Sequence, residues 1–120
     1  MRNFFAMFKG SLGFSDKDLE STRNRIYRLK EAVLDTLCND CTQKSKEDTE
    51  DFVYGESIYQ VYKANFILYN DIYKELIKRF EESQTSVFKK RMVHDIFRKE
   101  DFKEYFYRRY PIFKTFEGEI

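Results

Sequence analysis

The residues of this chain that are spaced like a reactive motif are its two cysteines. Cys38 and Cys41 form a C-x-x-C pair within the stretch VLDTLCNDC. Such a pair can supply two of the four ligands of a structural zinc ion, or both thiols of a redox couple. Which chemistry applies depends on the other ligands in the chain and on the position of the pair in its helix.

The zinc hypothesis is short of ligands. The chain has no second C-x-x-C and only one histidine, His94, which projects opposite the apolar face of the helix predicted around it. A zinc ion would need carboxylates as further ligands, or a second C-x-x-C from another copy of the chain. We therefore treat Cys38 and Cys41 as weak metal candidates and expect neither zinc nor any other cofactor.

The redox hypothesis conflicts with the predicted position of the pair. A reactive C-x-x-C usually lies at a helix N-terminus, where the helix dipole lowers the thiol pKa. Here the pair follows the last apolar residue of a predicted helix, and Asp35 and Asp40 are acidic neighbours that oppose a thiolate. We expect Cys38 to pack as a small apolar residue and Cys41 to lie beyond the helix end.

Catalytic motifs are missing from the sequence. It has no glycine-rich phosphate loop, no H-E-x-x-H and no G-x-S-x-G. One histidine leaves few schemes in which an imidazole activates a nucleophile, and the carboxylates are spread along predicted helix surfaces. We expect this protein not to be an enzyme.

Basic and aromatic residues alternate near the C-terminus, in FKEYFYRRYPIFKTF. Such interleaving can neutralise phosphates and stack bases, although the same pattern arises when aromatic rings form a core that basic side chains surround. Net charge is only +1, but residues 86–120 hold nine basic and six acidic side chains. The candidate nucleic-acid-binding residues are Lys89, Lys90, Arg91, Arg108, Arg109 and Lys114.

Composition predicts a single all-α domain spanning residues 1–120. The chain has 120 residues, only four glycines and one proline, and 18% aromatic residues, which favours helices over a turn-rich β fold. No apolar run reaches the length of a membrane span, and the N-terminal FFAMF segment lacks the features of a secretory signal. We expect a cytoplasmic protein that makes no membrane contact.

Apolar periodicity predicts a compact bundle of three to four helices. A short N-terminal apolar segment precedes a helix at about residues 15–39, which a polar connection at about 39–51 joins to a second helix. The connection holds neither proline nor glycine, so parts of it can extend either flanking helix. That second helix begins between residues 50 and 56 and ends near residue 82. A third covers residues 85–99, a shorter fourth ends at Pro111, and the tail returns to the bundle as an extended strap.

The second helix carries two adjoining apolar stripes. One is aliphatic and the other is mostly tyrosine, and together they are wider than the stripe of an ordinary surface helix. Such a helix needs neighbours on two sides, from its own chain or from a partner. We therefore predict a small interaction protein (an adaptor, inhibitor, immunity or regulatory factor) that binds a protein partner, self or heterologous. The candidate partner-binding residues are Tyr59, Tyr62, Tyr69 and Tyr73, and burial in the core is their alternative fate.

Overall fold

The computed structural model describes residues 16–50 and 58–116, and all its regular elements are helical. No β-strand occurs in these residues, so the prediction of an all-α bundle is confirmed. The elements in chain order are α2 (Asp16–Glu50), α3 (Ile58–Glu82), α4 (Val87–Ile96), α5 (Asp101–Arg109) and the 3₁₀ helix η1 (Pro111–Phe116). The predicted N-terminal apolar segment lies outside the described residues.

Helix α2 continues well past the predicted boundary. It has 35 residues, so residues 39–50 are helical and the prediction of a polar connection there is wrong. The reason is that the buried stripe continues in helical spacing through Cys38, Cys41 and Ser45, each of which is 0% exposed. Small polar side chains are typical of a loop, but no glycine or proline interrupts the helix in these residues.

Helices α3 and α4 follow the sequence prediction closely. Helix α3 ends at Glu82 as expected, whereas its predicted start lies outside the described residues. Helix α4 begins after Ser86, whose hydroxyl oxygen accepts a hydrogen bond from the backbone N–H of Lys89. Met92 and Ile96 of α4 are buried.

Residues after α5 form a helix where an extended strap was predicted. Helix α5 ends before Pro111 as expected, because proline restricts the backbone of the preceding residue. The next six residues, however, form η1, so the prediction of an extended conformation is wrong for them. Phe113 does return to the core, with its ring centroid 5.3 Å from that of Phe106, while Ile112 is exposed.

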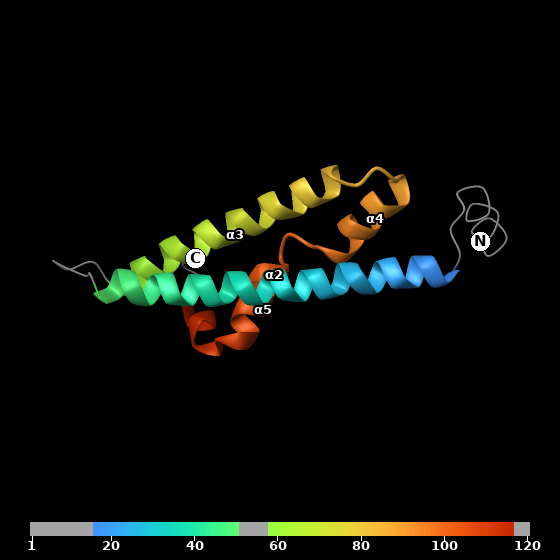
Figure 1. Ribbon diagram of the computed structural model, residues 1–120. Helices are drawn as coiled ribbons and strands as arrows, with labels where there is room; N and C mark the ends of the chain where they lie inside the picture. Colours follow the sequence, from blue (N-terminus) through green and yellow to red (C-terminus); the bar gives the residue numbers. More distant parts are fainter. Residues whose placement is uncertain (1–15, 51–57, 117–120) are drawn as a thin grey trace.

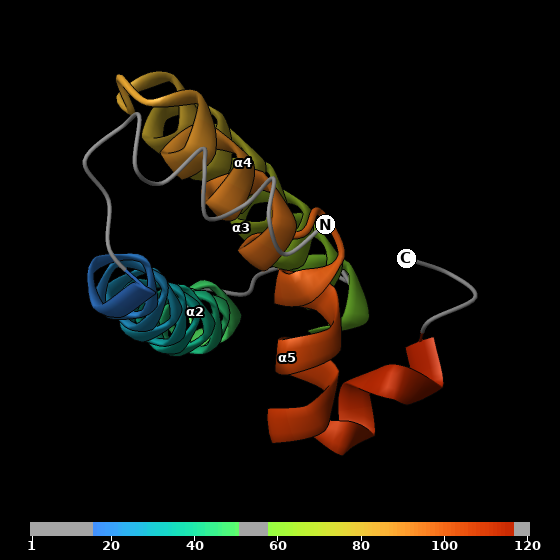
Figure 2. The same ribbon diagram turned by 90° about the vertical axis from the view of Figure 1, so that its right-hand side faces the viewer.

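The helices pack as an elongated bundle of 65 × 24 × 18 Å. Helices α2 and α3 run antiparallel and diverge from one end of the molecule, and α4 occupies the space between them at the wider end (Figure 1). Helix α5 packs against both α2 and α3 (Figure 2). The first turns of α2 extend beyond the other helices (Figure 1).

Aromatic rings fill the junction between α3 and α5. The ring centroid of Phe66 lies 5.7 Å from that of Phe102, 5.3 Å from that of Phe106 and 5.7 Å from that of Tyr107. Rings at these separations bury a large apolar area and contribute favourable ring–ring contacts. This cluster fixes the rotation of α3 about its own axis, and thereby decides which of its stripes faces the solvent.

Candidate interaction surface on α3

The tyrosine stripe of α3 turns toward the protein interior. Tyr73 is 0% exposed, and Tyr59, Tyr62 and Tyr69 are half-buried. Tyr69 packs against the core, and the ring centroid of Tyr62 lies 4.6 Å from that of Phe113. Of the four predicted partner-binding residues, Tyr73 is thus withdrawn from the surface, and the other three expose only part of their side chains.

The aliphatic stripe of α3 remains exposed. Ile58 is 56% exposed, Leu68 50% and Leu76 40%, while Val61 and Ile72 are half-buried between them. We call these five residues the aliphatic flank. Their spacing places them along one side of α3. Buried Asn65, which bonds to α2, lies within the same arc, so the flank is a band of apolar residues beside the contact with α2. Bands of this kind are typical of protein contact surfaces.

A charged pair borders the aliphatic flank. The side chain of Arg79 donates to the Glu75 carboxylate over 3.1 Å, one helical turn away, and both side chains are largely exposed. An exposed pair of this type adds little to stability. The pair places polar groups beside the apolar band, and polar groups are typical of the rim of an interface.

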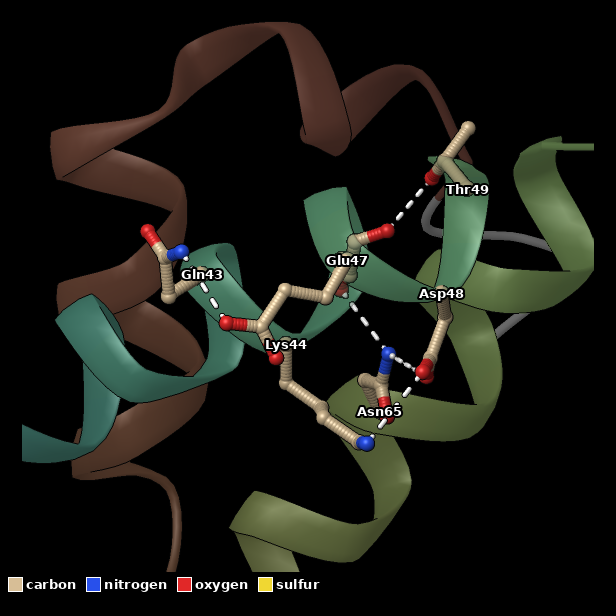
Figure 3. A network of polar contacts seen from close by, with 7 residues as sticks. Gln43, Lys44, Glu47, Asp48, Thr49 and Asn65 are labelled. Atoms are coloured by element: carbon tan, nitrogen blue, oxygen red, sulfur yellow. Dashed lines mark hydrogen bonds and ion pairs between the residues drawn. The ribbon is translucent and has the colours of Figure 1, made fainter. Parts of the chain in front are cut away.

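Helices α2 and α3 are held in register by a polar network (Figure 3). The side-chain amide of Asn65 donates to the Ser45 hydroxyl over 3.2 Å and to the Asp48 carboxylate over 3.0 Å. Lys44 pairs with the same carboxylate over 3.3 Å. The bond from Asn65, with the lysine, holds the pKa of Asp48 below its usual value. Because Ser45 and Asn65 are both buried, sliding α2 along α3 would strand polar groups.

A second buried polar junction joins three parts of the chain. The Asp101 carboxylate accepts hydrogen bonds from the Arg98 backbone N–H over 2.7 Å and from the Tyr73 hydroxyl over 3.4 Å, and it pairs with Lys30 over 3.0 Å. Burial and the adjacent carboxylate raise the pKa of Tyr73. Lys30 also donates to the Ile96 carbonyl over 3.0 Å. This junction ties Tyr73 to α2 and α5 and keeps the tyrosine stripe inward.

Neither junction is predicted by the sequence patterns described above. The signal for Ser45 was its position seven residues after Cys38 and four after Cys41, in phase with the buried stripe of α2. No comparable signal marks the junction at Asp101, because its side-chain partners Tyr73 and Lys30 are 28 and 71 residues away in the chain. Only the packing of the helices brings these groups together.

Both cysteines lie in the core of α2. The prediction that Cys38 packs inward is confirmed, whereas Cys41 is equally buried and does not lie beyond a helix end. Burial raises the pKa of each thiol to about 12, with the neighbouring Cys41 adding to the effect on Cys38. Both groups are therefore neutral thiols near pH 7. Among the described residues, no three histidine, cysteine, aspartate or glutamate side chains are grouped as metal ligands.

The predicted nucleic-acid-binding residues lie on separate parts of the bundle. Lys89, Lys90 and Arg91 belong to α4, whereas Arg108 and Arg109 end α5 and Lys114 lies in η1. Figure 1 shows α4 and α5 well apart. The guanidinium of Arg109 is paired with Asp35 over 3.0 Å, and the Tyr105 hydroxyl donates to the same carboxylate. The structure does not gather these residues into one basic surface, and nucleic-acid binding stays a prediction.

A surface groove of about 670 Å³ lies between α3 and α4. Ile77 and Phe97 contribute apolar surface to it. Its rim carries both signs of charge, including Lys78 and Arg98 beside Asp71, and exposed His94 lies there as well. Such a mixed rim favours no ligand of a single charge.

Comparisons with known proteins give this surface no precedent. No family model, curated protein or solved structure matches the chain. In the part of the chain that the structure describes, none of the helices combines the length and the apolar character that crossing a membrane requires.

Proposed function

We propose that this protein is a non-enzymatic interaction module that binds a protein partner through the aliphatic flank of α3. The observation that carries the proposal is the exposure of Ile58, Leu68 and Leu76 along one side of a helix whose other stripe is buried. Leaving three large aliphatic side chains in water forgoes the stabilisation that their burial provides. A partner protein that covers these side chains gains that stabilisation on binding.

Helix α3 is suited to this role because its own fold holds it rigidly. The aromatic cluster around Phe66 and the bond from Tyr73 to Asp101 anchor the helix to α5, and the Asn65 network anchors it to α2. A preorganised surface loses less conformational entropy on binding than a mobile one. The aliphatic flank is thus presented in a fixed arrangement.

The sequence offers a matched pair of variants for testing this proposal. Leu68 and Ile67 are adjacent, with exposed fractions of 50% and 43%, but helical geometry points their side chains about 100° apart. We expect Leu68→Asp, on the flank, to reduce capture of the partner at least about tenfold, whereas Ile67→Asp should leave capture close to wild type. Capture would be measured by affinity purification from the organism that encodes the chain, with quantification of the co-purifying protein.

Two outcomes would contradict the proposal. Equal losses for Leu68→Asp and Ile67→Asp would mean that binding does not depend on the flank. Unchanged capture by Leu68→Asp would place the contact elsewhere on the molecule. Circular dichroism of both variants would establish that each retains the helical fold, since both positions are exposed and tolerate a polar side chain.

A further inference from the structure

An apolar band extends from the aliphatic flank of α3 onto α2. Leu68, which is 50% exposed, lies about 160° around α3 from Phe66, whose ring packs on α5. Val33, which is half-buried, lies about 160° around α2 from Asp35, whose carboxylate is bound by side chains of α5. Both side chains therefore lie on the sides of their helices that face away from α5.

The register of the two helices brings these apolar residues to similar levels. Ser45 bonds to Asn65 in the antiparallel pair, so Val33 of α2 lies level with the residue after Leu76 of α3. Leu76 is 40% exposed, and Leu29, one turn before Val33 on the same side of α2, is 37% exposed. Aliphatic side chains of both helices thus line the band where α2 and α3 diverge (Figure 1).

A segment of this chain outside the described residues matches the band in polarity. Residues 4–8 have the sequence FFAMF, which contains four large apolar side chains and no charge. Covering both this segment and the band would remove apolar surface from water. The groove between α3 and α4 is a poorer match, because charged side chains form much of its rim and their burial is unfavourable.

The connection between this segment and α2 is long enough to reach the band. Leu29 and Val33 lie about 20 and about 25 Å along α2 from Asp16. The eight residues from Phe8 to Asp16 span up to about 27 Å when extended. The connection, KGSLGFS, holds two glycines, which adopt the backbone angles that a chain reversal requires. Phe8 can therefore lie level with Leu29 or Val33.

The spacing of the two apolar sets also agrees. Phe4 and Phe8 are about 13 Å apart in an extended chain, and their even separation puts both rings on the same side of it. Leu68 and Leu76 are about 12 Å apart along α3. When Phe8 lies level with Leu76, Phe4 lies level with Leu68, so a ring meets each exposed leucine.

We propose that residues 4–8 dock on the aliphatic flank of their own chain and cover it until a partner displaces them. The proposal rests on the proposed function, because it makes the flank the surface for which the segment and the partner compete. A tethered segment acts at a high effective concentration, so weak contacts are enough to hold it. The apparent affinity for the partner then falls with the fraction of molecules whose flank is free. The contact is autoinhibitory.

Methyl NMR of the full chain without a partner tests the docking. We expect Phe4→Asp/Phe8→Asp to move the methyl resonances of Leu68 and Leu76, because the rings that pack on them are withdrawn. Ile67 is the matched control, since it is 43% exposed but points about 100° away from Leu68. Unchanged leucine resonances, or equal shifts at Ile67, would overturn the proposal. Shifts that vanish on dilution would also overturn it, because the segment would then bind another copy.

Capture of the partner tests the competition. Phe4→Asp/Phe8→Asp should raise capture at least about threefold, because the flank is then free in every molecule. Phe4→Leu/Phe8→Leu keeps the segment apolar and should leave capture near wild type. Unchanged or lower capture by the aspartate variant would overturn the competition. If Leu68→Asp leaves capture unchanged while the leucine resonances move as expected, the docking is supported and the proposed function fails.

Discussion

The two apolar stripes of α3 lie side by side on one helix and differ in what covers them. The tyrosine stripe is closed in by α5, η1 and the Asp101 junction, whereas Ile58, Leu68 and Leu76 of the aliphatic flank remain exposed. The buried stripe consists of the residues with polar tips, and the exposed stripe consists of purely aliphatic ones. Polarity of the side chain therefore did not decide which stripe faces water.

The hydroxyl groups of the tyrosines explain why the tyrosine stripe can be the buried one. A buried tyrosine is stable when its hydroxyl has a partner, and the Asp101 carboxylate accepts that bond from Tyr73. Aromatic rings also bury more area than aliphatic side chains and fit the wide junction between α3 and α5. The aliphatic flank requires no polar partner, so it is suited to a contact that forms and separates.

The largest expected effect comes from truncating Tyr73 in the buried stripe, and Leu76 in the aliphatic flank is its comparison. Tyr73→Ala should lower the free energy of unfolding by about 3–5 kcal/mol, because it removes a fully buried ring and leaves a cavity. Leu76→Ala should cost less than about 1 kcal/mol, since that side chain is 40% exposed. Chemical denaturation of dilute protein measures both. Equal costs would remove the distinction between the stripes.

Alkaline pH should destabilise the folded protein through its two buried thiols. Folding raises the pKa of both thiols from 9.0 to about 12, so the folded state holds protons that the unfolded state releases, and stability falls as the pH rises above 9. Both thiols contribute to this loss, which continues until the pH reaches their folded pKa of about 12. Urea titrations from pH 8 to about pH 11 test this window.

A thiol-free variant is the control for that pH dependence. Cys38→Ala/Cys41→Ala should be less stable at pH 8, because it leaves a cavity, but its stability should fall less steeply above pH 9. The remaining slope arises in part from Tyr73, whose pKa is also raised. A slope identical to that of the wild type would mean that the thiols ionise normally in the folded protein.

An intermediate loss of stability is expected when Asn65, the centre of the polar network between α2 and α3, is replaced. Asn65→Ala should cost about 1–3 kcal/mol, because the buried Ser45 hydroxyl loses the Asn65 amide donor, and Asp48 loses it as well. Asn70→Ala is the matched control on the same helix. Its side-chain oxygen is buried without a hydrogen-bond partner among the described residues, so its removal should cost less.

Acid should reduce the cost of Asn65→Ala. The pKa of Asp48 is lowered in the fold, so its contribution is complete above the unfolded carboxyl pKa and is lost as the pH falls through the folded value. The difference in stability between wild type and Asn65→Ala should therefore shrink at low pH. A difference that stays constant with pH would mean that Asp48 does not share in the network.

The smallest expected effect on stability is that of Leu68→Asp. Its side chain is half exposed, so the free energy of unfolding of dilute protein should change by less than about 0.5 kcal/mol, as for Ile67→Asp. A change of several kcal/mol would show that the flank is part of the fold. That result would assign both stripes of α3 to the core and leave no separate surface.

Local patterns predicted much of the fold. The scarcity of glycine and proline indicated helices, the apolar spacing placed the end of α3 and the buried side of α4, and Pro111 marked the end of the fourth helix. The errors occurred where apolar periodicity was carried by unusual residues. Cys41 and Ser45 continue the buried stripe of α2, but their small polar side chains give no sign of burial, so the predicted helix ends too early.

The sequence by itself determined that this chain is helical and that α3 carries two apolar stripes, because both properties follow from residue spacing of three and four. Only the tertiary structure decided which stripe faces inward. That choice depends on contacts such as those of Tyr73 with Asp101 and of Phe66 with Phe106, which join residues 28 and 40 positions apart. Helical periodicity defines the faces of a helix, but it carries no information about which distant segment will cover each face.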